Sequence, residues 1–208
     1  MPRPLPAGVL AATDGEPDAV RTLILDAARR VIDARGLAAA STRAIAEESG
    51  VGGGTLYNYF DNHIQLLAKA IVQSARNLTG PILDLPARTG RATVAANLAY
   101  FVRHAATVLD RLVPAMAAAF SDNDLLAAVR REIAEADPLN DPAKVVERYL
   151  LAERDLGRVS ATADCRAAAS LIVSLCHDDA FNRYLHGASA RPKSRRKEIA
   201  LVARSVSE

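Results

Sequence analysis

Residues 41–60 read STRAIAEESGVGGGTLYNYF, and this stretch decides the fold of the amino-terminal part of the chain. Ala46 is small enough to let two helices cross closely. Gly50 can end the first helix in a left-handed conformation, which carries no steric cost for glycine. Apolar residues fall where two helices that cross near a right angle need contacts, at Ile45, Val51 and Leu56. This spacing predicts a helix-turn-helix, although other tightly connected helix pairs also show it.

The rest of the chain is predicted to be helical as well. Apolar residues recur at helical spacing almost everywhere, and no alternating strand pattern is present, so we expect an all-α protein. Residues 83–90 are expected to form a linker, Pro114 to bend or restart the chain, and Ser121 to cap the following helix. The expected helices cover about 18–34, 41–49, 55–59, 62–79, 91–112, 121–137, 142–156, 163–186 and 194–206.

The composition excludes few function classes by itself. The chain has 208 residues, half of them apolar, and its 26 basic and 24 acidic side chains give a net charge of +2. A nucleic-acid binder with this balance must concentrate its positive charge locally. Cys165 and Cys176 are eleven residues apart on one predicted helix and cannot form a disulfide there. With neither a signal peptide nor a membrane-length apolar run, we expect a reduced, cytoplasmic protein.

No catalytic constellation is visible in the sequence. There is no nucleophile with a matching base and acid, no phosphate-binding loop and no metal-ligand cluster, so we expect neither an enzyme nor a cofactor. The run from Cys176 to Asp179 offers too few ligands within one turn for a metal site. A core cysteine beside surface acids is the simpler interpretation.

Sequence motifs on both sides of the helix-turn-helix make its identification more specific. Residues 20–75 closely resemble the DNA-binding domain of the tetracycline-repressor (TetR) family. The resemblance is carried by Leu25-Asp26-Ala27-Ala28, Gly36, Ser41-Thr42-Arg43-Ala44-Ile45-Ala46, Gly50-Val51, Gly54-Thr55-Leu56-Tyr57-Asn58-Tyr59-Phe60 and Leu66-Leu67. The element Gly-Thr-Leu-Tyr-x-x-Phe is not required by helix packing alone, so the match is specific.

The resemblance implies a sequence-specific DNA-binding transcriptional regulator. It implies a homodimeric repressor that a small-molecule effector releases from a palindromic operator, with double-stranded DNA as a partner and no membrane. The expected domains are a disordered tail at 1–16, the helix-turn-helix DNA-binding domain at 17–62, and a helical effector-binding and dimerisation domain at 63–208.

The resemblance also assigns roles to single residues, because family members place the third helix in the major groove. Thr42 matches a phosphate-contacting position. Arg43 matches a position that contacts bases or phosphates, and an arginine there can read a guanine edge. For the tyrosines, core packing or a dimer contact is the alternative. The expected DNA-binding residues are Ser41, Thr42, Arg43, Gly53, Thr55, Tyr57, Asn58, Tyr59 and His63.

The departures from the family pattern concern charge. Gly52 and Gly53 stand where the family usually has a polar or charged residue, and His63 stands where it usually has a lysine. Residues 1–62 hold six arginines and no lysine against eight acids, so the basic surface expected of a DNA binder is faint. A helical interaction protein of the same fold with weak or lost DNA binding therefore stays open as an alternative. We expect close helix packing to require Gly54 but not Gly53.

Beyond residue 80 the chain resembles the family only in its layout of long helices. The family places its dimer interface on the last two, here about 163–186 and 194–206, and the first of these is rich in small residues that permit close packing. The alternative is an ordinary core helix. The expected dimer contacts are Ala168, Leu171, Leu175 and Phe181.

A polar face of the long middle helix is the candidate effector wall. Its residues lie three or four positions apart, which also fits a simple solvated face. The expected effector-binding residues are Asn97, Tyr100, His104 and Thr107. A basic segment near the carboxyl terminus is expected to be solvated, or else to contact DNA or an acidic partner; it comprises Arg191, Lys193, Arg195, Arg196 and Lys197.

Overall fold

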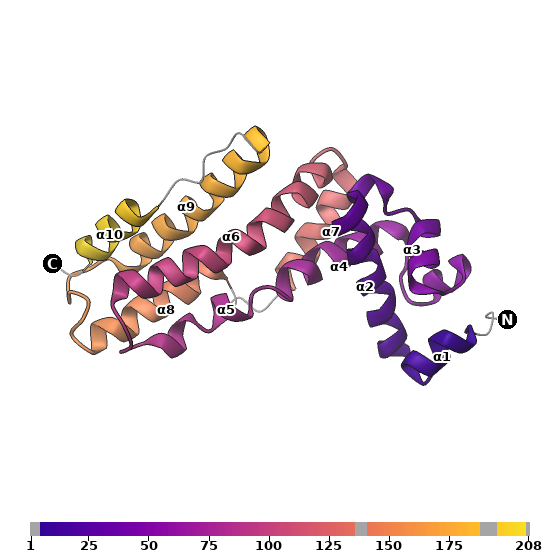
Figure 1. Ribbon diagram of the computed structural model, residues 1–208, viewed down its shortest axis with the longest axis horizontal. Helices are drawn as coiled ribbons and strands as arrows, with labels where there is room; N and C mark the ends of the chain where they lie inside the picture. Colours follow the sequence, from indigo (N-terminus) through magenta and orange to yellow (C-terminus); the bar gives the residue numbers. More distant parts are fainter. Residues whose placement is uncertain (1–4, 136–140, 188–194, 207–208) are drawn as a thin grey trace. The chain divides into compact units, whose positions relative to one another are not determined.

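The computed structural model describes residues 5–135, 141–187 and 195–206, and within them every regular element is a helix (Figure 1). The all-α prediction is confirmed. The chain divides into two compact units. The first comprises the described residues of Met1–Ala75 and Pro114–Glu135, and the second those of Arg76–Val113 and Ala136–Glu208. The expected domain boundary at residues 62 and 63 therefore falls inside the first unit.

The first unit is built around α2 (Pro17–Arg35), which packs against η1 (Leu37–Ala39) and α3 (Thr42–Ser49). Proline in the first turn favours its start, and Gly36, with φ 81°, ends it in a conformation that glycine adopts without strain. Its buried stripe is Val20, Ile24, Leu25, Ala27, Ala28 and Val31. The remaining elements of this unit are η2 (Gly53–Asn58), α4 (His63–Arg76) and α7 (Asn123–Ala134).

Part of the expected disordered tail is folded. Residues 7–13 form α1 (Ala7–Thr13), which contacts α2. Val9 and Thr13 are buried, and the Thr13 hydroxyl donates a hydrogen bond to the Val9 carbonyl at 2.7 Å. The propensity of this short segment is low by itself, so its helix depends on burial against the rest of the unit. Residues 1–4 lie outside the described chain.

In the second unit, α8 (Pro142–Asp155) lies beside α9 (Cys165–His186), and α10 (Arg196–Ser205) packs on α9 (Figure 1). Asp141 caps α8 by accepting a hydrogen bond from the Ala143 amide at 2.8 Å, as the Asp-Pro pair predicts. The segment expected to be a linker instead contains short helices that pack against α8 or each other, α5 (Gly80–Leu83) and η3 (Leu85–Arg88).

Two further expectations need correction. The chain does not restart at Pro114, which lies inside α6 (Val94–Ala119); the helix continues past it, where Ala115 and Ala119 are buried. The cap of α7 is Asp122 and not Ser121. The Asp122 carboxylate accepts hydrogen bonds from the amides of Asp124 and Leu125, both at 3.0 Å, whereas the Ser121 hydroxyl donates back to Ala118.

A buried polar network fixes the loop before α6. The Asn97 amide nitrogen lies 3.2 Å from the Arg88 carbonyl, 2.7 Å from the Arg91 carbonyl and 3.0 Å from the Tyr149 hydroxyl, and its oxygen accepts from Arg88 Nε at 3.0 Å. Glu153, fully buried, accepts from the Gly90 amide and pairs with Arg158. Burial raises the pKa of the Tyr149 phenol; the Asn97 hydrogen bond opposes that rise.

Both cysteines are buried and unpaired with each other. Burial raises the pKa of Cys165, and it raises that of Cys176 to about 12, so both stay as neutral thiols at physiological pH. The Cys176 thiol lies 3.2 Å from the Ile172 carbonyl on its own helix. Across the described residues, no helix combines the length and apolarity that a membrane span needs.

Candidate nucleic-acid interface

The helix-turn-helix forms where the sequence predicts it. Ser41 caps α3 by accepting a hydrogen bond from the Ala44 amide at 3.2 Å, and Gly50 follows the helix with φ 71°, in the left-handed region. The apolar contacts of the motif, Ile45, Ala46, Val51 and Leu56, are all buried. The exposed surface of the motif is consequently set by the remaining residues of α3 and η2.

The recognition element is a 3₁₀ helix, η2, and not a turn of α-helix. Thr55 is 5% exposed and Leu56 is buried, whereas Tyr57 is 55% exposed and Asn58 is exposed beside it. The side chain of Thr55 therefore packs inside the unit, and its assignment as a DNA contact is wrong for this conformation. Tyr59 is half-buried, which leaves Tyr57 and Asn58 as the side chains that η2 presents to a partner.

The charges on α3 are paired with each other. Arg43 Nε lies 2.8 Å from Glu47 one turn on, and this fully exposed hydrogen bond raises the pKa of Arg43. Glu48 lies 2.6 Å from Arg30 Nε of α2. No charged residue falls within η2. Because an exposed ion pair of this type contributes little to stability, Arg43 can leave Glu47 for a phosphate or a base at small cost.

His63 begins α4 close to the start of α3. Its Nδ1 lies 3.4 Å from the Thr42 hydroxyl, so two of the predicted DNA-binding residues are brought together. Desolvation lowers the pKa of His63, which keeps the imidazole neutral at pH 7. At this pH the histidine supplies a hydrogen-bonding group where the TetR-family pattern usually supplies a lysine charge.

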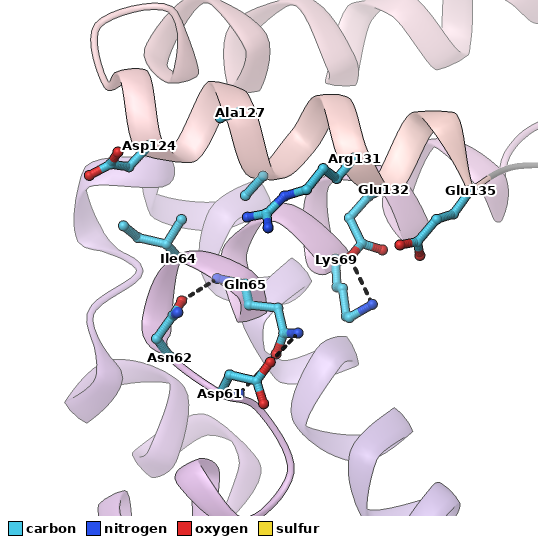
Figure 2. A pocket seen from close by; sticks show the side chains of 11 residues that line it. Asp61, Asn62, Ile64, Gln65, Lys69, Asp124, Ala127, Arg131, Glu132 and Glu135 are labelled. Atoms are coloured by element: carbon cyan, nitrogen blue, oxygen red, sulfur yellow. Dashed lines mark hydrogen bonds and ion pairs between the residues drawn. The ribbon is translucent and has the colours of Figure 1, made fainter.

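Behind this surface, α4 and α7 enclose a hollow of about 430 Å³ (Figure 2). Asn62 caps the start of α4 by accepting from the Gln65 amide at 2.8 Å, and the Gln65 side chain bonds in turn to Asp61. The ion pair between Lys69 and Glu132 joins the two helices at 2.7 Å, with both side chains largely buried. Local sequence patterns do not predict this pair, because its partners are 63 residues apart.

The structure separates the residues expected to form the effector wall on α6. The rings of Tyr100 and His104 contact each other with centroids 4.3 Å apart and a tilt of 57°, and the Arg88 guanidinium lies 4.0 Å from the Tyr100 ring centre. Asn97 is fully buried with its amide fully used in the network described above, so it is a structural residue and not an effector contact. Thr107 is exposed, and its hydroxyl lies 3.5 Å from the Arg103 carbonyl.

The expected dimer contacts on α9 also separate into two groups. Leu171 and Phe181 are 57% and 53% exposed, and Leu175 is half-buried. Ala168, by contrast, is 5% exposed because it faces the core of its own chain, so its assignment to an interface is wrong. The exposed apolar face continues on α9 and α10 through Tyr184, Leu185 and Leu201.

The acids after Cys176 serve an ion-pair cluster. Arg195, with 10% of its side chain exposed, pairs with Asp178, with Asp179 at 2.6 Å and with Glu198 at 3.4 Å. Arg195 is thus a buried part of the basic segment that was expected to be solvated; Arg196 and Lys197 are exposed, and Arg191 and Lys193 lie outside the described residues. The cluster ties α9 to α10.

The recognition element η2 begins with two glycines, Gly53 and Gly54, that have no neighbouring atoms close enough to exclude a larger side chain. A Cβ at Gly53 or at Gly54 would meet no atom within 4 Å, and neither residue has a left-handed backbone. The expectation that packing requires Gly54 is therefore wrong. Glycine at these two positions is required neither by the fold of the motif nor by its backbone angles.

Replacing Gly53 by alanine is consequently expected to stabilise the protein by about 0.4–1 kcal/mol, because it removes disorder from the unfolded chain without strain. Gly54→Ala should act in the same direction. Gly50→Ala is the matched control, and it should destabilise by about 1–2 kcal/mol because alanine is strained at φ 71°. Urea unfolding measures all three. A destabilised Gly53→Ala protein would contradict the backbone geometry described here.

Comparisons with known proteins agree with this geometry. The profile of the bacterial regulatory proteins of the tetR family matches residues 24–70. Among curated proteins, none matches the chain significantly in sequence. A solved structure from Mesorhizobium loti, described as a TetR-family transcriptional regulator, has a TM-score of 0.73 at 17% identity, covering 91% of this chain and 96% of that one.

Two regulators named FadR have the same fold. The fatty acid degradation regulator FadR from Bacillus halodurans has a TM-score of 0.61 at 19% identity, over 88% of this chain and 93% of its own. FadR from Bacillus subtilis, solved in complex with stearoyl-CoA, has a TM-score of 0.57 at 18% identity, over 89% and 98%. Residues 24–70 thus match the profile of the tetR family of bacterial regulatory proteins, and the chain has the fold of solved structures described as TetR-family transcriptional regulators.

Proposed function

We propose that the protein is a homodimeric, sequence-specific DNA-binding repressor that leaves a palindromic operator when a small molecule binds its second unit. The observation that carries the proposal is the capped helix-turn-helix of residues 42–58. Its apolar residues are buried, while Tyr57 and Asn58 on η2 and Arg43 on α3 are exposed. Hydroxyl, amide and guanidinium groups at such positions are suited to phosphates and base edges.

Selection of bound sequences from random duplex DNA tests this proposal. Enrichment of a palindrome, with half-sites spaced about 34–36 Å apart for a dimer, supports it. In the same selection, Arg43→Ala should lose preference at one base pair if Arg43 reads a guanine; a uniform loss of affinity would make it a phosphate contact. A wild-type protein that enriches no sequence would instead favour an interaction protein that has lost DNA binding.

The dimer is proposed from the exposed apolar face of α9 and α10. Leu171, Phe181 and Leu185 lie on one side of α9, since steps of three and four residues connect them, and Leu201 of α10 is equally exposed. Exposed apolar groups gathered in this way mark a surface that a partner covers. A second copy of the chain fits best because TetR-type operators need two recognition elements.

We expect the double variant Leu171→Glu and Phe181→Glu to be monomeric at micromolar concentration, where the wild-type protein is dimeric. The reason is that two carboxylates would be buried without partners at the interface. Sedimentation equilibrium measures both masses. Lys144→Glu, which adds a carboxylate at an exposed position of α8, is the control and should remain dimeric. A monomeric wild-type protein contradicts the dimer; a dimeric double variant moves it to another face.

The effector is proposed to bind beside Tyr100 and His104. The two neighbouring rings offer an apolar surface, and Arg88 and Arg103 lie 4.0 Å and 5.9 Å from the Tyr100 ring centre, which suits an apolar molecule carrying an acidic group. The complex of FadR from Bacillus subtilis with stearoyl-CoA gives this chemistry a precedent on the same fold. Such a ligand releases DNA only if it binds the DNA-free conformation more tightly.

Thermal-shift measurements with medium- and long-chain carboxylates check the effector site. A ligand that raises the melting temperature of the wild-type protein is expected to lose this effect on Tyr100→Ala and to keep it on Lys144→Ala, an exposed change on α8. The same ligand should lower operator affinity. An unchanged shift on Tyr100→Ala would place the effector elsewhere in the molecule.

A further inference from the structure

Some polar side chains of the helix-turn-helix already make hydrogen bonds or ion pairs within the protein, and others do not. Ser41 accepts the capping hydrogen bond of α3, Thr42 lies within reach of His63, and Arg43 is paired with Glu47. The amide of Asn58 is exposed, and within the described part of the chain it makes no hydrogen bond or ion pair. Its donor and its acceptor are therefore both available to an incoming molecule.

Few side chains project from the part of η2 that precedes Asn58, because it begins with glycines. Gly54 lies one 3₁₀ turn before Tyr57, and both are exposed, so a glycine is aligned with Tyr57 on the outer face of η2, and the exposed Asn58 is the next residue in the chain. A side chain at Gly53 or Gly54 would project into open space. Because these positions carry none, a duplex can approach the backbone of η2 closely, and the short side chain of asparagine can reach a base edge.

The chemistry of the amide selects one base. A carboxamide offers one acceptor and one donor side by side, and adenine presents the complementary N6 donor and N7 acceptor in the major groove. Guanine offers two acceptors there, which suit arginine, and cytosine offers a lone donor. With no charged group on η2, readout by this element depends on neutral hydrogen bonds.

We propose that Asn58 reads the adenine of one A·T base pair in each half of the operator, and that the glycines before it give the duplex the approach this contact needs. The inference rests on the proposed DNA-binding function. It names Asn58 as the residue of η2 that sets base preference, whereas Arg43 belongs to α3.

The test is a sequence selection from random duplex DNA with the full chain and three variants. The wild-type protein should enrich a motif with a fixed A·T pair in each half-site, and changing that pair should lower affinity by about five- to 150-fold. Asn58→Ala should lose the preference at that pair only. Asn58→Asp should transfer it to C·G, because a carboxylate accepts a hydrogen bond from cytosine N4.

Tyr57→Phe is the matched control on the neighbouring residue. It should lower affinity for every sequence alike and keep the motif, as expected for a phosphate contact. Circular dichroism should show all three variants folded, since both side chains are exposed. If the wild-type protein enriches no motif, the DNA-binding proposal itself fails. If it enriches a motif that Asn58→Ala and Asn58→Asp leave unchanged at every position, the inference about Asn58 is overturned while the function stands.

Discussion

Asn97→Leu is expected to destabilise the second unit by about 3–4 kcal/mol. The change leaves the Tyr149 hydroxyl and the carbonyls of Arg88 and Arg91 without the donor that now serves them, and each unsatisfied buried group costs about 1–3 kcal/mol. Leucine has the same branching as asparagine but is larger, so crowding at this fully buried position adds to the cost. Urea unfolding followed by circular dichroism measures the free energy of unfolding.

Two variants show whether the hydrogen bonds are responsible. Tyr149→Phe removes the hydroxyl that contacts both Asn97 and Glu153 but leaves Asn97 its two carbonyl acceptors, so it should cost about 2 kcal/mol, less than Asn97→Leu. Thr107→Ala changes an exposed residue of the same helix and should fall within about 0.5 kcal/mol of the wild-type value. If Asn97→Leu is no more destabilising than Thr107→Ala, the network does not hold the loop before α6.

Arg195→Met is expected to destabilise the protein by about 2–3 kcal/mol. The guanidinium is 10% exposed and connects Asp178 and Asp179 of α9 with Glu198 of α10, and its hydrogen bond to Asp179 raises the pKa of Arg195. Removing one partner of a buried ion pair costs about 3–5 kcal/mol, and the partial exposure of Asp178 and Glu198 lowers that figure here. Methionine retains most of the aliphatic packing of the arginine side chain, so the loss of stability measures the contribution of the charged group.

Thermal or urea unfolding of three proteins separates charge from geometry. Arg195→Lys keeps the positive charge but lacks the planar guanidinium group that can bind two carboxylates. Its stability should lie between those of the wild-type protein and Arg195→Met. Arg196→Ala, on the adjacent exposed residue, is the control and should change stability by less than about 0.5 kcal/mol. Equal stability of Arg195→Met and Arg196→Ala would show that the cluster contributes nothing to the packing of α10.

Local sequence signals predict helix ends well where the contacts that form those ends are also local in the chain. Ser41, Gly50 and Asp141-Pro142 mark helix ends through contacts within four residues, so the sequence predicts them directly. Pro114 shows the limit of such signals. Its local preference against a helix is outweighed by the burial of α6 beyond it, and that burial depends on residues distant in the chain.

The candidate sites were predicted less completely, for a related reason. Helical spacing places Asn97, Tyr100 and His104 on one side of α6, but it does not say that Tyr149, 52 residues away, meets the first of them. In the same way, the small size of Ala168 indicates close helix packing without saying which helix it faces. The position of Glu153 would have allowed a further prediction. Its carboxylate falls on the apolar stripe of α8 with Val146, Tyr149 and Leu150, which indicates a buried charge that needs partners.

The two buried thiols give this protein a built-in kinetic probe of its own local opening. A thiol reagent can reach Cys165 or Cys176 only when the surrounding helices separate, so the labelling rate under native conditions reports the population of open states. Because Cys165 lies at the start of α9 and Cys176 near its middle, single-cysteine variants would resolve whether the helix frays from its end or opens as a unit. Comparing those rates with and without operator DNA would show whether DNA binding changes the opening of α9.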